Sequence, residues 1–167
     1  SPIFQKQLKN IKYRGSSARV HFALNKCPEV NGVPINQMQS VFSISPTIEY
    51  LERAYDDAKY GRISENLIIE FSIPSLIDKH YAPSGKHVLS ATIQYLPYNL
   101  QNCNWNDGLK EKVLNNVIYI LEKYIPGFNG MVEDSLIMTP VDFEANLGLT
   151  EGNLNHGEMT LDQFFFM

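Results

Sequence analysis

The sequence lacks the glycine-rich motifs that hold nucleotide phosphates. No G-x-G-x-x-G follows any predicted strand, and no P-loop G-x-x-x-x-G-K-[ST] occurs in the 167 residues. Such motifs bind phosphate because their glycines let backbone N–H groups approach it at the N-terminus of a helix. The chain therefore has no visible nucleotide-phosphate site of its own.

Clustered metal ligands and paired cysteines are also missing. Cys27 and Cys103 lie far apart and form no C-x-x-C, and the four histidines include no pair at H-x-H or H-x-x-x-H spacing. Structural metal sites usually have clustered ligands, so no metal site is predicted. We interpret the two cysteines as reduced thiols in preference to a disulfide, and we expect a cytoplasmic location.

Basic charge and long apolar runs are scarce too. The net charge is −4 and the isoelectric point is near 5.5, so nucleic acid is not an expected partner. No apolar run approaches the roughly 18 residues that span a bilayer. The first residues, SPIFQKQLKN, lack the apolar block of a secretory signal. The sequence predicts a soluble chain without a transmembrane segment.

What the sequence does contain is a globular balance, with 44% hydrophobic and 19% charged residues. This length favours one domain, residues 1–167. Period-2 patterns predict strands and helical spacing predicts helices. The expected strands are 18–24, 40–44, 67–73, 88–95 and 132–138, and the expected helices are 3–11, 45–60, 106–125 and 139–147. We predict an α+β fold, with a mostly antiparallel mixed sheet of about five strands and helices packed on one face.

Local signals predict where the helices begin and which faces they bury. Ser45 is the expected N-cap of one helix, with Pro46 at its first position. Its expected apolar face comprises Ile48, Leu51, Ala54, Tyr55 and Ala58. Asn106 is the expected cap of the longest helix, and Thr139 with Asp142 suggests a capping box. The shared core of sheet and longest helix is predicted to comprise Leu89, Ala91, Ile93, Val117, Ile120 and Leu121.

Two short stretches contain candidate functional residues. Three glycines, Gly148, Gly152 and Gly157, surround His156, a composition typical of a backbone that turns or lies close to another group. His156 either contacts a ligand or is held by backbone hydrogen bonds within its own loop. Tyr95 and Tyr98 end a central strand, where they can contact a ligand or form an amphipathic rim.

Several segments in register resemble the phytoene dehydrogenase-related FAD-dependent oxidoreductases. The order and approximate spacing of the matching segments extend over nearly the whole chain. These segments are Ile73-Pro74-Ser75-Leu76-Ile77-Asp78, Ala82-Pro83-x-Gly85-Lys86-His87-Val88, Gln94-Tyr95-x-Pro97-Tyr98, Tyr124-x-Pro126-Gly127-Phe128, Thr139-Pro140-x-Asp142-x-Glu144, and Gly148-Leu149-Thr150-x-Gly152-Asn153-x-x-His156-Gly157-Glu158-x-x-Leu161-Asp162-Gln163-x-Phe165.

The resemblance implies that this chain corresponds to an inserted substrate-binding domain, with both flavin-binding segments outside the residues given. It implies FAD in the full-length protein and, as a partner, the FAD-binding domain of the same polypeptide. The flavin would take a hydride from a small apolar or amphipathic substrate. Tyr95, Tyr98, Asn153 and His156 would line the substrate cavity, and no residue is assigned as catalytic acid or base.

A second interpretation keeps the α+β fold without the chemistry. In it the chain is a stand-alone binding or interaction module, and the apolar run from Phe164 to Phe166 contacts a partner. This run lies at the end of the given sequence, where uncovered apolar residues favour association.

The missing phosphate motif generates the first prediction. The 167-residue chain, expressed alone, should bind no flavin and have no oxidoreductase activity, because it lacks the glycine turn and helix N-terminus that hold a pyrophosphate. The absorbance spectrum of the purified protein checks this. A yellow protein with stoichiometric FAD would contradict the prediction.

Overall fold

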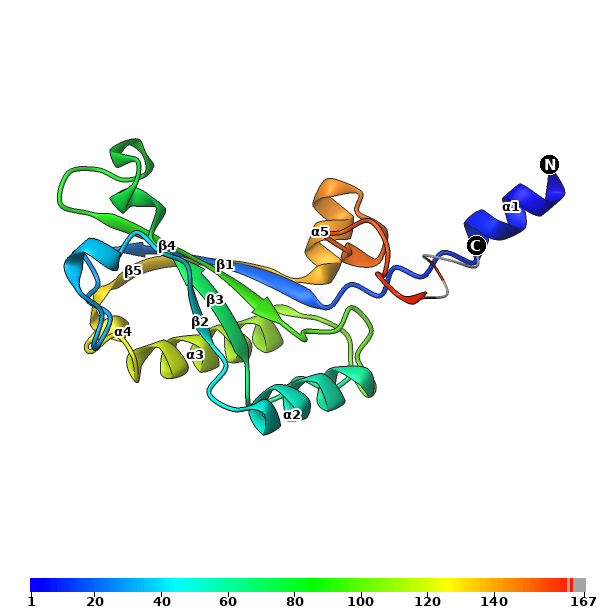
Figure 1. Cartoon of the computed structure of the whole chain (residues 1–167), viewed down its shortest axis with the longest axis horizontal. Helices are drawn as coiled ribbons and strands as arrows, with labels where there is room; N and C mark the ends of the chain where they lie inside the picture. Colours follow the sequence, from blue (N-terminus) through cyan, green and yellow to red (C-terminus); the bar gives the residue numbers. More distant parts are fainter. Residues whose placement is uncertain (162, 164–167) are drawn as a thin grey trace.

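The computed structural model describes residues 1–161 and 163 and contains one antiparallel sheet (Figure 1). Every strand pairing is antiparallel, and the strand order is β2-β3-β4-β1-β5. The strands are β1 Ser17–Leu24, β2 Phe42–Ile44, β3 Ile68–Ser72, β4 His87–Gln94 and β5 Val132–Met138. The predicted α+β class and the five predicted strands are confirmed.

The helices differ in how closely they pack on this sheet. In the described part of the chain they are α1 Pro2–Lys9, α2 Ile48–Lys59, α3 Asp107–Glu122, α4 Phe128–Met131 and α5 Pro140–Leu147. The two longest, α2 and α3, lie on one side of the sheet, whereas α5 stands beside one end of it (Figure 1). Helix α1 projects away from the sheet and buries no residue.

The core lies between the sheet and α3. Alternate side chains of β1 and β4 point to this side, so that Val20, Phe22 and Leu89 are fully buried. From α3, Val117 and Leu121 pack into the same cluster. All six residues predicted for this core are buried, because period 2 and period 3.6 each place their apolar positions on one face.

The predicted start of α2 is wrong, and only part of its predicted apolar face is buried. The N-cap is Thr47, whose Oγ1 accepts a hydrogen bond from Tyr50 N at 3.1 Å, and the helix begins at Ile48. Ala54 is the buried residue of α2, whereas Ile48 is 75% exposed and Tyr55 is 51% exposed. The hydroxyl of Tyr50 donates to Leu67 O at 2.9 Å, and this contact turns the Tyr50 side of the helix inward.

The other predicted caps are confirmed. Asn106 Oδ1 accepts from Leu109 N at 2.9 Å, and Thr139 with Asp142 forms the capping box of α5. Two details differ from the predictions. Helix α4, which follows the left-handed Gly127, was not predicted, and β4 ends at Gln94, so Tyr95 lies outside the strand. None of the helices within residues 1–161 and 163 has the length and apolar character needed to cross a membrane.

The predicted core is tested by shortening one side chain of α3. Ile120 is 5% exposed, so Ile120→Ala should lower the free energy of unfolding by about 2–5 kcal/mol. Asn115→Ala, at an exposed position of the same helix, is the matched control and should change it by about 0.5 kcal/mol or less. Urea denaturation of both variants measures the difference. A loss well under about 1 kcal/mol for Ile120→Ala would contradict the assigned core.

Candidate functional site

The segment that leads into β1 and the segment that follows α5 lie side by side at one end of the sheet (Figure 1). We call this region the junction and define it as residues 12–16, 95–98 and 144–158. Gly15 N donates to Glu151 O at 3.1 Å, and Glu158 N donates to Lys12 O at 2.9 Å. Arg14 and Glu158 form an ion pair between the same two segments. Residues far apart in the sequence are thus joined by direct hydrogen bonds.

Two glycines allow the backbones of the junction to approach closely. A Cβ added to Gly15 would overlap the carbonyl oxygen of Glu151. A Cβ added to Gly152 would overlap the backbone of Pro140, and the φ of Gly152 is +65°, in the left-handed region. The predicted role of Gly152 in a close backbone approach is confirmed, and Gly15 is a second such position.

Strained backbone concentrates in the junction. Among the described residues, the non-glycine positions with positive φ are Arg14, Tyr95, Glu151 and His156, with values of 29°, 61°, 50° and 58°. All four belong to the junction. Each such position costs roughly 1–3 kcal/mol, so the surrounding hydrogen bonds must hold the backbone there.

Tyr98 connects the end of β4 to the rest of the junction. Its hydroxyl donates to Glu144 Oε2, and Glu144 Oε1 accepts from Glu151 N at 2.8 Å. The Tyr98 hydrogen bond, together with the one from Glu151 N, lowers the pKa of the Glu144 carboxyl. The same hydrogen bond raises the pKa of the Tyr98 phenol. Tyr98 N also donates to Gly15 O at 2.8 Å, so this residue bonds to both segments.

Asn153 organises the loop that follows α5. It is 9% exposed, and its Nδ2 donates to Tyr13 O. Its Oδ1 accepts from Asn155 N at 2.7 Å and from Gly157 N at 3.3 Å. The side-chain amide therefore forms an Asx-type turn and also bonds to the segment before β1.

The structure does not bring all four predicted site residues into one cluster of contacts. Tyr98 and Asn153 are committed to hydrogen bonds within the junction, and the half-buried Tyr95 packs edge-on against Tyr55 of α2, with ring centroids 5.6 Å apart. His156 lies on the turn-rich loop predicted for Gly152 to Glu158, but its side chain is exposed. The expectation of a buried, backbone-bonded His156 is therefore wrong for the imidazole ring.

The side of the sheet opposite α3 is a second candidate surface, which we call the open face. It consists of side chains that alternate with the core positions. They are Arg19, His21 and Ala23 of β1, Glu70 and Ser72 of β3, Val88, Ser90, Thr92 and Gln94 of β4, and Asp134, Leu136 and Met138 of β5. These side chains are exposed or half-buried, whereas Ile68 of β3, which faces the same side, is buried. No helix of the described part of the chain lies over the middle of this face.

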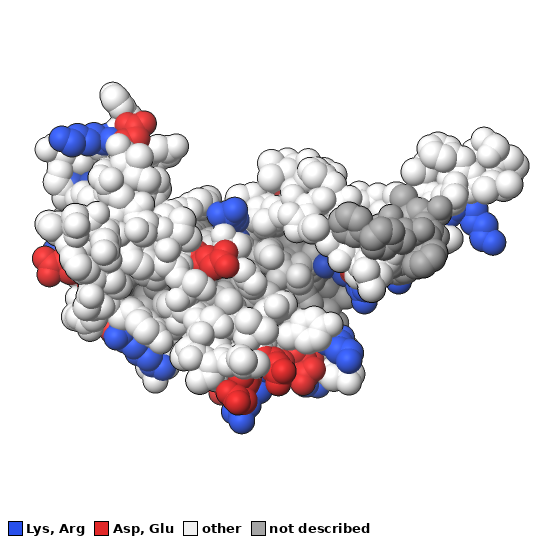
Figure 2. All heavy atoms as spheres, in the orientation of Figure 1, with Lys and Arg blue, Asp and Glu red and all other residues white. Residues whose placement is uncertain are grey.

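Raised parts of the chain stand at both ends of the open face. The connection between β3 and β4, residues 73–86, rises at one end, and α5 with its loop rises at the junction end (Figure 1). In the space-filling view the outline of the molecule dips between them (Figure 2). The sequence contained the signal for this face in the polar positions of the strands, but Arg19 and His21 were not predicted as site residues.

His21 lies near the middle of the open face. Its cross-strand neighbours are Ser90 of β4 and Leu136 of β5. Burial lowers the pKa of the imidazole, and the positive charge of Arg19 lowers it further. At neutral pH the His21 ring is therefore uncharged, with one nitrogen able to accept a hydrogen bond and the other able to donate one.

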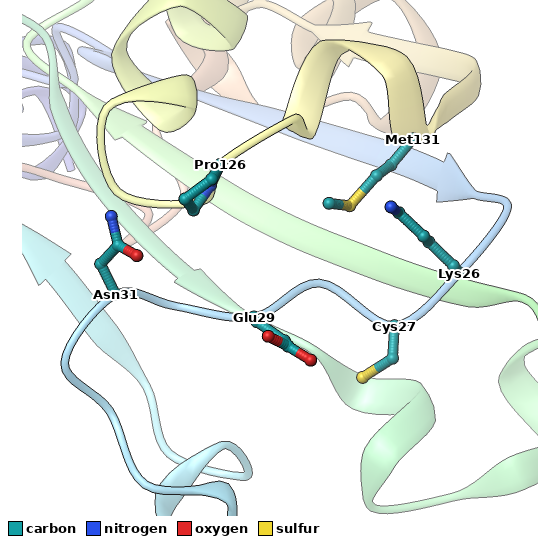
Figure 3. Close-up of a pocket in the computed structure, with 6 residues that line it drawn as sticks. All are labelled: Lys26, Cys27, Glu29, Asn31, Pro126 and Met131. Atoms are coloured by element: carbon teal, nitrogen blue, oxygen red, sulfur yellow. The ribbon is translucent and has the colours of Figure 1, made fainter.

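A pocket at the end of the sheet opposite the junction is a weaker candidate. It has a volume of about 240 Å³ and is lined by Lys26, Cys27, Glu29, Asn31, Pro126 and Met131 (Figure 3). Burial and the nearby Glu29 raise the pKa of the Cys27 thiol. Because the thiolate is the nucleophilic form, this shift disfavours a reactive cysteine at neutral pH.

A serine–histidine pair near the same end has a structural role. Ser75 Oγ lies 3.0 Å from His87 Nδ1 and accepts a hydrogen bond from Val88 N at 3.1 Å. Ser75 is only 6% exposed. The pair therefore fixes the connection between β3 and β4 and is poorly placed for a nucleophile.

The described residues do not fit a dinucleotide cofactor or a metal ion. Every strand pairing is antiparallel, so these strands contain no parallel β-α-β turn to cradle a pyrophosphate. The first turns of α2 and α3 carry Glu49 and Asp107, which oppose an anion there. Within residues 1–161 and 163, no group of three or more His, Cys, Asp or Glu side chains is placed to hold a metal ion.

Sequence comparison supports a relation between this α+β chain and an oxidoreductase family. The chain is 33% identical over 172 aligned residues to pyridine nucleotide-disulfide oxidoreductase domain-containing protein 2 of Rattus norvegicus, and equally identical to the Mus musculus protein of that name. Each alignment covers 98% of this chain and 30% of the relative, so the chain spans about a third of the length of these curated proteins. No family model matches the chain.

The Tyr98–Glu144 hydrogen bond generates a pH-dependent prediction. Because the bond lowers the pKa of Glu144, its contribution to stability is present above the unfolded-state pKa, roughly 4.3, and is lost as the pH falls through the lower folded-state pKa. Tyr98→Phe should therefore lower the melting temperature at pH 7 and have a smaller effect near pH 3. Thermal unfolding followed by circular dichroism measures both values.

Tyr119→Phe provides the control, since Tyr119 is 63% exposed on α3. It should leave the melting temperature nearly unchanged at both pH values. Equal destabilisation by Tyr98→Phe at pH 7 and pH 3 would show that the ionised Glu144 does not contribute through this bond.

Proposed function

We propose that the chain is the substrate-binding domain of an FAD-dependent oxidoreductase related to phytoene dehydrogenase. The relation to larger proteins named for an oxidoreductase domain supports this proposal. In it, FAD binds to other segments of the same polypeptide, and the open face forms the roof of the substrate cavity. The substrate is apolar or amphipathic, and its hydride passes to the flavin.

The observation that carries the proposal is the combination of the junction with the open face. The segment before β1 and the segment after α5 are hydrogen-bonded to each other at one end of the sheet. An inserted domain requires this arrangement if its first and last segments are both to connect to one neighbouring domain. The open face begins beside the junction and carries half-buried side chains, and none of the helices that the structure describes covers its middle. A domain attached at the junction can cover this face.

Within this proposal the four residues predicted from the sequence have different roles. Tyr98 and Asn153 hold the junction in place at the margin of the cavity, since their polar groups are hydrogen-bonded within the junction. Tyr95 adds an aromatic edge beside Tyr55. His156, whose ring is exposed on the loop after α5, is available to contact the substrate or the flavin domain.

A tryptophan introduced on the open face tests whether this face lies close to the flavin. In the FAD-loaded full-length polypeptide, Thr92→Trp should shorten the fluorescence lifetime of the flavin, because an indole at short range quenches flavin emission by electron transfer. Asn115→Trp, on the helix at the other side of the sheet, should leave the lifetime unchanged.

The FAD content of each variant is measured first, from the absorbance of the purified protein. Unchanged lifetimes in FAD-loaded Thr92→Trp would contradict a flavin-facing open face. A full-length polypeptide that retains no FAD would contradict the oxidoreductase proposal itself.

A further inference from the structure

Arg19 lies on an interior strand of the open face, toward the junction end. It lies on β1, between β4 and β5, and its exposed side chain alternates with the buried Ala18 and Val20. Its cross-strand neighbours are Thr92 on one side and Met138 on the other. Directly opposite residues in antiparallel strands have Cβ atoms about 4.5–5.5 Å apart, so these side chains share one patch.

The guanidinium of Arg19 has no carboxylate partner in the part of the chain that the structure describes. The ion pairs found there join other residues, such as Lys86 with Glu133 and Lys110 with Asp142. Glu70 lies in the same cross-strand row, beyond Thr92, but its Oε1 accepts from Gln94 Nε2 at 2.8 Å. Glu70 and Asp134 both lie on the open face, but among the described residues no ion pair joins either carboxylate to Arg19.

The surroundings of Arg19 differ on its two sides. Toward β5 lie the apolar side chains of Met138 and Leu136, and Leu136 is 57% exposed. Toward β4 lie the hydroxyls of Thr92 and Ser90, both half-buried. A molecule with an apolar part and a polar or charged end matches this division.

The geometry points to Arg19 as the binding site for the carboxylate of an amphipathic substrate. The planar guanidinium binds the two carboxylate oxygens side by side, and the Thr92 hydroxyl donates a further hydrogen bond. The apolar chain of the substrate then lies along Leu136 and Met138. This inference rests on the proposed function and names the class of its substrate.

The charge of the patch favours a carboxylate over a phosphate. Arg19 supplies one positive charge, and the neighbouring His21 is neutral at neutral pH because burial and Arg19 lower the pKa of its ring. One guanidinium balances the single charge of a carboxylate. A phosphate monoester carries about two negative charges and calls for a further cation.

Dodecanoate and 1-dodecanol are suitable probes, because they share an apolar chain and differ in charge. Their binding to the FAD-loaded full-length polypeptide is measured by equilibrium dialysis, and the flavin absorbance is recorded in the same samples. Dodecanoate should bind about tenfold or more tightly than 1-dodecanol, as expected for a charge-assisted hydrogen bond.

Substitutions of Arg19 assign this preference to one residue. Arg19→Gln should remove it and weaken dodecanoate binding about tenfold or more, whereas Arg19→Lys should retain part of it, because an ammonium keeps the charge without the planar fork. Arg53→Gln is the control, since Arg53 is exposed on α2 away from the open face. It should bind both probes as the wild type does. If Arg19→Gln lowers the yield of folded protein, Arg19→Lys supplies the comparison.

The two measurements separate the possible failures. Unchanged dodecanoate affinity in folded Arg19→Gln, wild-type affinity in Arg19→Lys, or no binding of dodecanoate to the wild type would overturn the carboxylate site. Equal binding of the two probes with a change in flavin absorbance would overturn the carboxylate site and leave the proposed function standing. Arg19-dependent dodecanoate binding without any flavin response would support the site and contradict the proposed position of the open face.

Discussion

The close backbone contact between Gly15 and Glu151 is the constraint on which the arrangement of the junction depends. Gly15 N donates to Glu151 O, and a side chain at position 15 would overlap that oxygen. Glu151 is in turn held by Glu144, which accepts its N–H and also the hydroxyl of Tyr98. One short chain of hydrogen bonds therefore joins the segment before β1, the end of β4 and the loop after α5.

The same contact explains why strained backbone is tolerated in this region. Arg14, Glu151 and His156 have positive φ on the two segments that the contact joins, and Tyr95 has positive φ where β4 ends beside them. Hydrogen bonds from several directions hold these conformations, which isolated residues rarely adopt. The result is a hydrogen-bonded margin beside the open face, where Arg19 and His21 lie on β1, between β4 and β5.

Much of the fold could be predicted because its signals are local. Alternation along β1 and β4, helical spacing along α3 and the capping box of Thr139 each depend on a few neighbouring residues, and the structure contains all of them. The error at α2 has a tertiary cause. Its predicted stripe includes Ile48 and Tyr55, which are exposed, whereas the buried side carries Ala54 and Tyr50, whose hydroxyl bonds to Leu67 just before β3.

The sequence by itself determined the α+β class, the strands and the core, because burial imposes a period on each element. It also identified Tyr98, Asn153 and the glycine-rich loop as unusual, but it could not identify their partners. Only the tertiary structure decided that Tyr98 bonds to Glu144, that Asn153 bonds to Tyr13, and that Arg19 has no carboxylate beside it among the described residues. The physical reason is that strand order and register place distant residues together, and no local periodicity encodes those neighbours.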